Sequence, residues 1–225
     1  MTAVVLIALG ALLYSAWLLE AVLDTGIDPV SAYVSELAAQ DQPFGELFRA
    51  TDLVAGLLVL AGVLFALRRG PRRPWELAGW AGTALFGAAT AVDSRLPLSC
   101  PPTTDPACAV REGAGLVPTT HTAHAVSSSL AMTGAVIGMI ALTVAARRYG
   151  RWPALARSGP VLVAVELAAG GWTLASVAAF EAGHGTYGLG VGQRIQVLVV
   201  AVWLGVLALS LARERTRGRT AKAAV

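Results

Sequence analysis

The sequence predicts an all-α protein that crosses a membrane several times, and both its composition and its apolar runs carry this prediction. Of the 225 residues, 56% are hydrophobic and only 14% are charged. Several apolar runs are about 20 residues long, which is the length that a helix needs to cross the hydrocarbon core of a bilayer. A soluble core does not require such runs, so residues 1–225 are interpreted as one polytopic membrane domain.

The apolar runs predict six transmembrane helices. They cover residues 3–23, 52–67, 77–95, 121–145, 160–180 and 193–212. The second run is the shortest, and an earlier start of its helix, around Phe44, is an alternative, because helix ends are the hardest feature to place from sequence. The first run has neither a basic region before it nor a cleavage site of small residues after it, so it is interpreted as a retained helix and not as a signal peptide.

Basic residues gather in the connections on one side of these spans. Thirteen of the 17 Lys and Arg residues follow the second, fourth and sixth spans: Arg68, Arg69, Arg72, Arg73, Arg147, Arg148, Arg151, Arg157, Arg213, Arg215, Arg217, Arg219 and Lys222. The positive-inside rule therefore predicts that both termini are cytoplasmic and that residues 213–225 form a basic cytoplasmic tail. Anionic lipid headgroups explain this basic face, so no nucleic-acid partner is expected.

The first outer connection, residues 24–51, predicts an ordered, amphipathic helical lid. Asp28 can cap a helix with Pro29 at its first position, and the face of that helix is apolar at Val30, Tyr33, Val34 and Leu37. A second apolar face follows at Phe44, Leu47 and Phe48, and Glu46, Arg49 and Asp52 recur close enough to pair along a helix.

Burial of these two apolar faces predicts where the lid lies. We expect the segment from Asp28 to Asp52 to fold over the outer ends of the third and fourth spans. This placement brings Glu36, Arg49 and Asp52 near Asp93 and His121. We further expect Arg49 to hold one of the partly buried carboxylates through a charge-assisted bond.

The connection between the third and fourth spans contains the only two cysteines, in the sequence CPPTTDPAC. On an oxidising outer side, Cys100 and Cys108 are predicted to form a disulfide. A metal-binding or redox pair is the alternative. The prolines that stiffen this loop, and the absence of a third ligand nearby in the sequence, favour the disulfide.

The fourth span begins with TTHTAHAVSSS, in which His121 and His124 occupy neighbouring positions of one helix face and Ser128 lies one turn further on. Three interpretations stay open: a metal site, an acid–base or hydrogen-bonding pair, and an anchor at the edge of the bilayer. A zinc site needs a third protein ligand, for which His184 and Asp93 are the candidates. Nothing in the sequence requires a cofactor.

Polar residues at the same end of several spans predict a shared outer pocket. They are Glu20, Asp93, Arg95, Gln193, Arg194 and Gln196. Glu166 lies apart in the inner half of the fifth span, either as a buried hydrogen-bonded carboxyl or as part of a proton path. The deep tryptophans Trp17, Trp80, Trp172 and Trp203 either pack the bundle or line a pocket for an isoprenoid or acyl chain.

Four motifs resemble a known family. They are the S-x-Y-V-S-E-L of Ser31 to Leu37, the D-Q-P-x-x-x-L-F-R-x-x-D of Asp41 to Asp52, the aspartate Asp93, and the H-x-x-H-x-x-x-S of His121 to Ser128. Together they look like the bacterial six-helix membrane family catalogued as domain of unknown function 998, over nearly the whole chain. The resemblance implies a multi-pass protein of a bacterial cytoplasmic (inner) membrane, and it names no reaction, substrate or cofactor.

Three functions from different classes remain as hypotheses. The favoured one is an acid–base enzyme that acts on a lipid or isoprenoid by hydrolysis or by proton-initiated cyclisation, because ionisable residues gathered in a cavity are more often functional than not. The alternatives are a proton-coupled transporter, against which the absence of an internal repeat argues, and a non-catalytic accessory or scaffold protein. The enzyme's predicted catalytic residues are Glu36, Asp52, Asp93, His121 and His124, and its supporting residues are Tyr33, Ser35, Arg49, Ser128, Trp172 and Glu166.

Overall fold

The computed structural model describes residues 1–68 and 73–223, and these residues contain helices and no strands. The basic residues Arg69 and Arg72 lie outside the described residues, as do the side chains of Arg215, Arg217, Arg219 and Lys222. The α-helices are α1 (Thr2–Tyr14), α2 (Gly45–Leu67), α3 (Pro74–Asp93), α4 (Pro106–Gly113), α5 (Thr119–Arg148), α6 (Pro153–Glu181) and α7 (Leu189–Ala223). Two short 3₁₀ helices, η1 (Ala16–Ala21) and η2 (Val34–Ala38), lie between α1 and α2.

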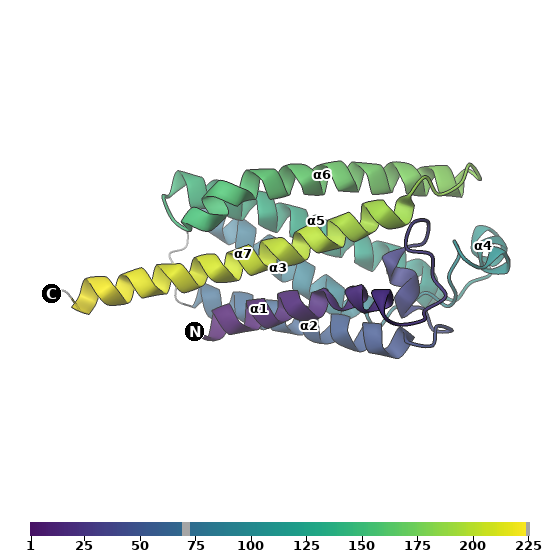
Figure 1. Ribbon diagram of the computed structural model, residues 1–225, viewed down its shortest axis with the longest axis horizontal. Coiled ribbons are helices and arrows are strands. Elements are labelled where there is room, and N and C mark those ends of the chain that lie inside the picture. Colours follow the sequence, from purple (N-terminus) through teal and green to yellow (C-terminus); the bar gives the residue numbers. More distant parts are fainter. Residues whose placement is uncertain (69–72, 224–225) are drawn as a thin grey trace.

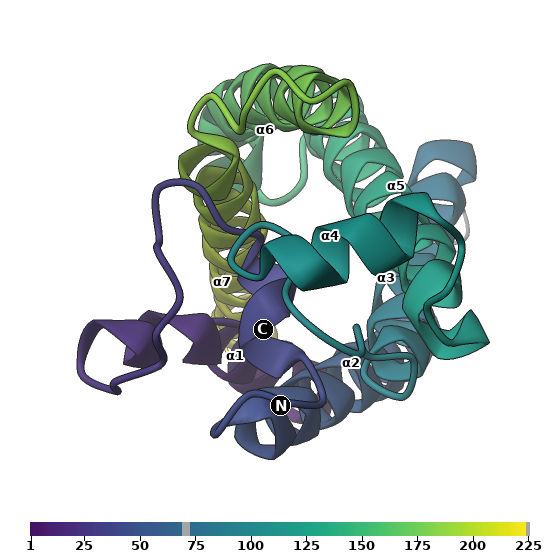
Figure 2. The same cartoon turned by 90° about the vertical axis from the view of Figure 1, so that its right-hand side faces the viewer.

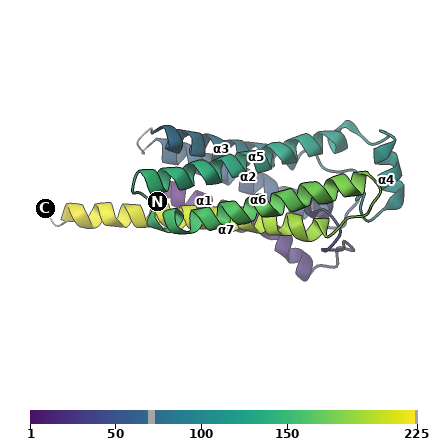
Figure 3. The same ribbon diagram turned by 90° about the horizontal axis from the view of Figure 1, so that it is seen from above.

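The long helices form a closed ring. Their main contacts run in the order α1, α2, α3, α5, α6, α7 and back to α1. Both termini lie at one end of the bundle, and η2, α4 and the connection between α6 and α7 lie at the other (Figures 1 and 3). Helix α4 lies across the ring at this second end, which we call the α4 end (Figure 2).

Five of the segments are long and apolar enough to cross a membrane in the described part of the chain, so the protein is a helical membrane protein. They are Thr2–Ala21, which combines α1 and η1, and then Gly45–Leu67, Thr119–Arg148, Pro153–Glu181 and Leu189–Glu214. Helix α3 does not reach the same apolarity, although the sequence predicts a span at 77–95.

Helix α3 is less apolar because small residues cover its contacts with α2 and α5. A Cβ atom added to Gly134 of α5 would lie 2.5 Å from the backbone nitrogen of Phe86, and one added to Gly56 of α2 would lie 2.5 Å from the carbonyl oxygen of Gly87. Glycine at these positions lets the helix backbones touch. The glycines thus adapt one side of α3 to its neighbouring helices, while Leu77, Leu85 and Val92 on its other side are exposed.

Helix α2 begins at Gly45, after Phe44 as its N-cap, so the earlier of the two predicted starts is correct and the start at residue 52 is wrong. The first span is also interrupted. Helix α1 ends at Tyr14, and the hydroxyl of Ser15 donates to the carbonyl of Ala11 (2.9 Å) where the 3₁₀ helix η1 takes over.

The helix predicted to start at Asp28 does not form. Asp28 instead closes a turn, in which its carboxylate accepts from the backbone nitrogen of Val30 (3.0 Å). Between Asp28 and the start of α2, only η2 is helical. The carbonyl of Ala32 and the nitrogen of Val34, which a helix would use, bond to side chains of α7. Tertiary hydrogen bonds thus replace the local ones.

The two predicted apolar faces are only partly buried. Leu37 and Phe48 are buried in a small hydrophobic cluster with Ile27 and Ala32, whereas Val30 and Leu47 are 54% and 41% exposed. The predicted disulfide between Cys100 and Cys108 is present.

Candidate functional site

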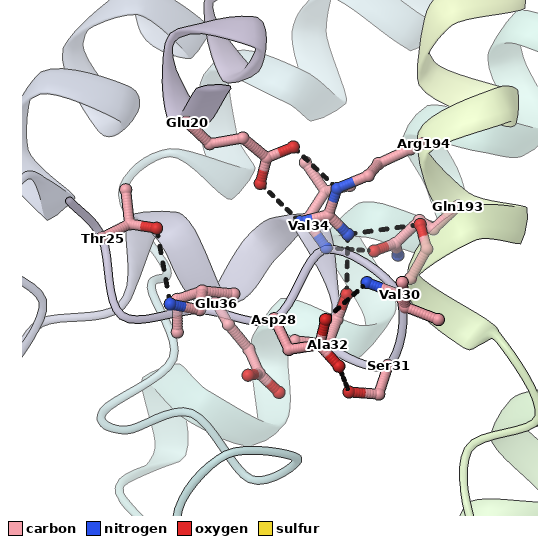
Figure 4. A network of polar contacts seen from close by, with 12 residues as sticks. Glu20, Thr25, Asp28, Val30, Ser31, Ala32, Val34, Glu36, Gln193 and Arg194 are labelled. Carbon is pink, nitrogen blue, oxygen red and sulfur yellow. Dashed lines mark hydrogen bonds and ion pairs between the residues drawn. The ribbon is translucent and has the colours of Figure 1, made fainter. Parts of the chain in front are cut away.

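The connection from residue 24 to residue 44, which we call the cap segment, is held to the start of α7 by side-chain bonds (Figure 4). Arg194 of α7 forms a two-point ion pair with Glu20 (2.7 and 2.6 Å) and also donates to the carbonyl of Ala32 (2.9 Å). The side-chain oxygen of Gln193 accepts from the backbone nitrogen of Val34 at 2.5 Å. The cap segment is therefore fixed to the α4 end from Ala32 onward, while Asp28, Pro29 and Val30 before it are exposed.

Glu36 holds the other side of the cap segment. Its buried carboxylate accepts from the backbone nitrogen and hydroxyl of Thr103 (2.9 and 2.7 Å) and from the hydroxyl of Thr104 (3.1 Å), both in the loop that the disulfide closes. The cavity described below does not include Glu36 in its lining. Glu36 thus joins the cap segment to the loop that the disulfide closes. Because Glu36 does not line the cavity, this placement does not favour its predicted catalytic role.

Burial raises the pKa of the Glu36 carboxyl above its ordinary value, and the hydrogen bonds from Thr103 and Thr104 oppose this increase only in part. A raised folded-state pKa means that the contribution to stability is present below the unfolded pKa, about 4.3, and is lost as the pH rises through the folded value. We expect amide protons of Val34–Ala38, corrected for intrinsic exchange rates, to be best protected in mildly acidic buffer and less protected as the pH rises. Glu36→Gln should flatten this profile in hydrogen-exchange measurements, and an unchanged profile in that variant would assign the pH dependence to other groups.

Arg49 contacts no carboxylate, which corrects the expectation that it holds one. Its guanidinium donates to the carbonyl oxygens of Ala38 and Ala39 (2.7 and 3.1 Å). Glu46 and Asp52 form no ion pair with it. The carbonyl of Ala39 also accepts from the backbone nitrogen of Gln42 (3.3 Å), so Arg49 holds the backbone turn after η2 against the start of α2.

A cavity of about 950 Å³ lies inside the ring at the α4 end. All of the long helices and the cap segment contribute to its wall, and apolar side chains such as Leu37, Met132 and Val177 form much of it. The cavity brings together nine of the residues that the sequence singles out for a catalytic or supporting role: Tyr33, Ser35, Arg49, Asp52, Asp93, His121, His124, Ser128 and Glu166.

Asp93 and His124 form the closest ionisable pair in this cavity. His124 Nδ1 lies 3.1 Å from Asp93 Oδ1, which is ion-pair distance, although the two groups are not aligned as in a good hydrogen bond. The hydroxyl of Ser127 donates to the same carboxylate oxygen. A carboxylate thus lies beside Nδ1 of the imidazole, and both residues line the cavity.

Asp52 has no hydrogen-bond or ion-pair partner in the described part of the chain, although it lies within electrostatic range of Asp93 and His124. Tyr14, the last residue of α1, is close to the carboxylates of Asp52, Asp93 and Glu166. Tyr14 is not among the site residues predicted from the sequence, in which its only signal is a hydroxyl group within the apolar run 3–23.

Glu166, which the sequence places in the inner half of its span, lines the same cavity as the outer polar residues. Among the α6 residues that line the cavity, Glu166 is the farthest from the α4 end. Its Oε1 accepts from Gln196 (3.2 Å), and its buried Oε2 has no partner. Three more buried polar atoms of the lining lack partners: Trp17 Nε1, Thr90 Oγ1 and Thr173 Oγ1.

His121 uses both of its ring nitrogens on neighbouring groups. Its Nδ1 accepts from the backbone nitrogen of Ser99 (3.1 Å) and contacts the hydroxyl of Ser99 (2.9 Å), so the proton resides on Nε2, 3.2 Å from Glu112. These contacts fix the start of α5 against the α3–α4 connection. A role of His121 in catalysis stays a prediction.

The predicted zinc ligands do not assemble. No group of three His, Cys, Asp or Glu side chains in residues 1–68 and 73–223 is arranged to hold a metal ion. His184 is exposed in the connection between α6 and α7 and takes no part in the cavity lining.

Most of the four deep tryptophans do not line the cavity, which was one of the two roles predicted for them. Trp172 is 43% exposed, lies outside the lining, and donates to the carbonyl of Tyr187 (3.0 Å), so it anchors the α6–α7 connection. Trp80 and Trp203 are buried in the helix core. Only Trp17 of the four deep tryptophans lines the cavity.

The protein is thus a helical membrane protein whose ring of helices encloses a cavity with ionisable side chains at one end. The family model described as "Protein of unknown function (DUF998)" matches residues 7–210, and the chain belongs to this family. No curated protein and no solved structure is significantly similar to the chain.

Proposed function

We propose that the protein crosses a bacterial cytoplasmic membrane six times, with α3 as the sixth span and the α4 end outside the cell. Both termini lie at the same end of the bundle, which requires an even number of crossings, and α3 runs within the ring beside α2 and α5. Arg147, Arg148 and Arg213 at the terminal end agree with a cytoplasmic face. The disulfide at the α4 end fits an oxidising exterior.

Single-cysteine labelling tests this orientation. The two native cysteines are paired and do not react, so a new cysteine reports alone. In intact cells, an impermeant maleimide should label Gly113→Cys at the exposed end of α4 and should not label Arg148→Cys until the membrane is opened. Labelling of Arg148→Cys alone from outside would reverse the proposed topology.

We further propose that the cavity is the active site of an acid–base enzyme acting on a lipid-soluble substrate. The observation that carries this proposal is the convergence of Asp52, the Asp93–His124 pair and Glu166 in one cavity of about 950 Å³, a size typical of ligand sites. Carboxyl groups without partners are costly within a membrane, and such residues are retained mainly where function needs them. Their apolar surroundings suit a lipid or isoprenoid substrate.

Each group has a role in this proposal. His124 Nε2 transfers a proton to or from the substrate, and Asp93 orients the ring and stabilises its charged form. Asp52 is the second acid or base, on α2, which lies beside α3 in the ring. A protonated carboxyl here can start a cyclisation or rearrangement, and the same pair can activate water for hydrolysis.

A comparison of lipids before and after incubation tests this proposal without a chosen substrate. The purified protein is reconstituted with a total lipid extract of a bacterial membrane, and the lipids are analysed by untargeted mass spectrometry at both time points. We expect at least one lipid to be converted by the wild type and not by His124→Gln. Identical extracts with both proteins, at equal reconstitution, would reject the enzyme.

A further inference from the structure

The most exposed part of the cavity wall belongs to α5 and α6. Every cavity-lining residue that is exposed belongs to one of these two helices, and the lining residues from α1, the cap segment, α2, α3 and α7 are buried or half-buried. The exposed lining residues are Thr122, Ala125, Ser129, Thr133 and Ile137 of α5 and Leu167, Gly171, Leu174 and Glu181 of α6.

These residues form two facing stripes. Their spacing of three, four or seven positions places them along one side of each helix. The two helices touch near the terminal end, where a Cβ atom on Gly159 would lie 2.3 Å from Thr143 Oγ1. Toward the α4 end, Leu167 is 52% exposed and Leu174 is 72% exposed although both line the cavity. The gap is therefore a side opening with an apolar rim, at a depth that faces lipid.

The interior, by contrast, is rich in carboxyl groups. Five carboxyl groups line it, from Asp52, Asp93, Glu112, Glu166 and Glu181, against a single guanidinium, that of Arg49. Arg49 already donates to two carbonyl oxygens. The unpartnered Oε2 of Glu166 and Oγ1 of Thr90 point to a ligand with hydrogen-bonding groups, and a negative headgroup would meet repulsion here.

We propose that the cavity takes an amphiphile without negative charge, which enters from the bilayer between α5 and α6. Its polar end, such as a hydroxyl or an amine, lies among Asp52, His124 and Glu166, and its apolar chain leaves between Ile137 and Leu174. This inference rests on the proposed function for the identity of the cavity as a substrate site. It adds the route of entry and the charge of the substrate.

Photoreactive probes that share one alkyl chain and end in a hydroxyl, an amine or a sulfonate test the proposal by binding alone. The protein is reconstituted in phosphatidylcholine vesicles, labelled with light, digested and mapped. The hydroxyl and amine probes should label α5 and α6, and the sulfonate, which stays ionised, should label them about tenfold less or not at all. Equal labelling by the three probes would overturn the charge preference.

Two glycine variants test the entry route. A Cβ atom on Gly171 or on Gly205 of α7 meets nothing within 4 Å, but only Gly171 lines the cavity. Both leucine variants gain helix propensity and should fold, which thermal melting in detergent checks. Gly171→Leu should reduce labelling by the amine probe about tenfold, and Gly205→Leu should leave it unchanged. Equal labelling of the two variants would reject the side opening.

The two proposals fail in different ways. Asp93→Asn removes the acid–base pair but leaves the opening, so it should lose turnover and still be labelled. Probe labelling that depends on Gly171, together with no lipid conversion by any form, would keep the side opening and reject the enzyme. Lipid conversion that is abolished by Asp93→Asn but unaffected by Gly171→Leu would keep the enzyme and reject the side opening.

Discussion

Asp93→Asn is expected to lower turnover of the lipid substrate by about 10²–10⁴-fold, the range that a positioned acid–base group contributes. The amide keeps the size of the side chain and its contact with Ser127, but it cannot stabilise a protonated His124. The loss should appear in the rate of lipid conversion at saturating substrate, with detergent melting temperature and expression close to wild type.

Asp105→Asn is the matched control for this change. Asp105 is the N-cap of α4, where its carboxylate accepts from the nitrogen of Ala107 (2.9 Å), and asparagine caps helices equally well. We expect no change in turnover. If Asp93→Asn instead unfolds the protein, or converts lipid as fast as the control, Asp93 is a structural residue and the proposed pair has no catalytic part.

Arg194→Met is expected to have the largest effect on stability, a loss of about 3–5 kcal/mol, because it leaves the carboxylate of Glu20 without its partner in a low-dielectric site. The side chains of this ion pair are only 9% and 11% exposed. The same change frees the carbonyl of Ala32 and releases the cap segment from α7. Reversible unfolding in mixed detergent micelles measures the difference.

Two further variants separate the ion pair from other causes. The double change Glu20→Gln with Arg194→Met removes both charges and should regain part of the loss. Arg111→Met breaks an exposed contact with Asp105 (3.8 Å, 49% and 40% exposed), which is worth at most about 1 kcal/mol. An Arg194→Met variant no less stable than Arg111→Met would show that the cap segment does not depend on this arginine.

The helical bundle was predictable because its signals are local. Apolar length determines the spans, and a pair of cysteines eight residues apart on an oxidising side determines the disulfide. Helix α3 was the hardest span to predict, because glycines that pack against α2 and α5 lower its mean hydropathy. A start of α2 near Gly45 was predicted only as an alternative to a start at residue 52, because the polar residues of its first turns are also typical of a loop.

The candidate site was predictable in part. Residues at the ends of neighbouring spans had to meet, so Asp52, Asp93 and His124 fall in one cavity as expected. The partners of Glu36 and Arg49 were beyond reach, because both bond to segments that are brought near only by tertiary contacts of α7 and the disulfide loop. Helix periodicity also failed after Val30, where Arg194 and Gln193 bond to the backbone carbonyl of Ala32 and the backbone nitrogen of Val34.

A structure of the protein in nanodiscs formed from bacterial membrane lipids tests the central claim most directly. We predict elongated density inside the cavity, with its polar end within hydrogen-bond distance, about 3.5 Å or less, of His124 or Asp52 and its chain passing between Ile137 and Leu174 toward the bilayer. A cavity that holds only water, with lipid density confined to the outer surface of α5 and α6, would contradict an active site for a lipid-soluble substrate.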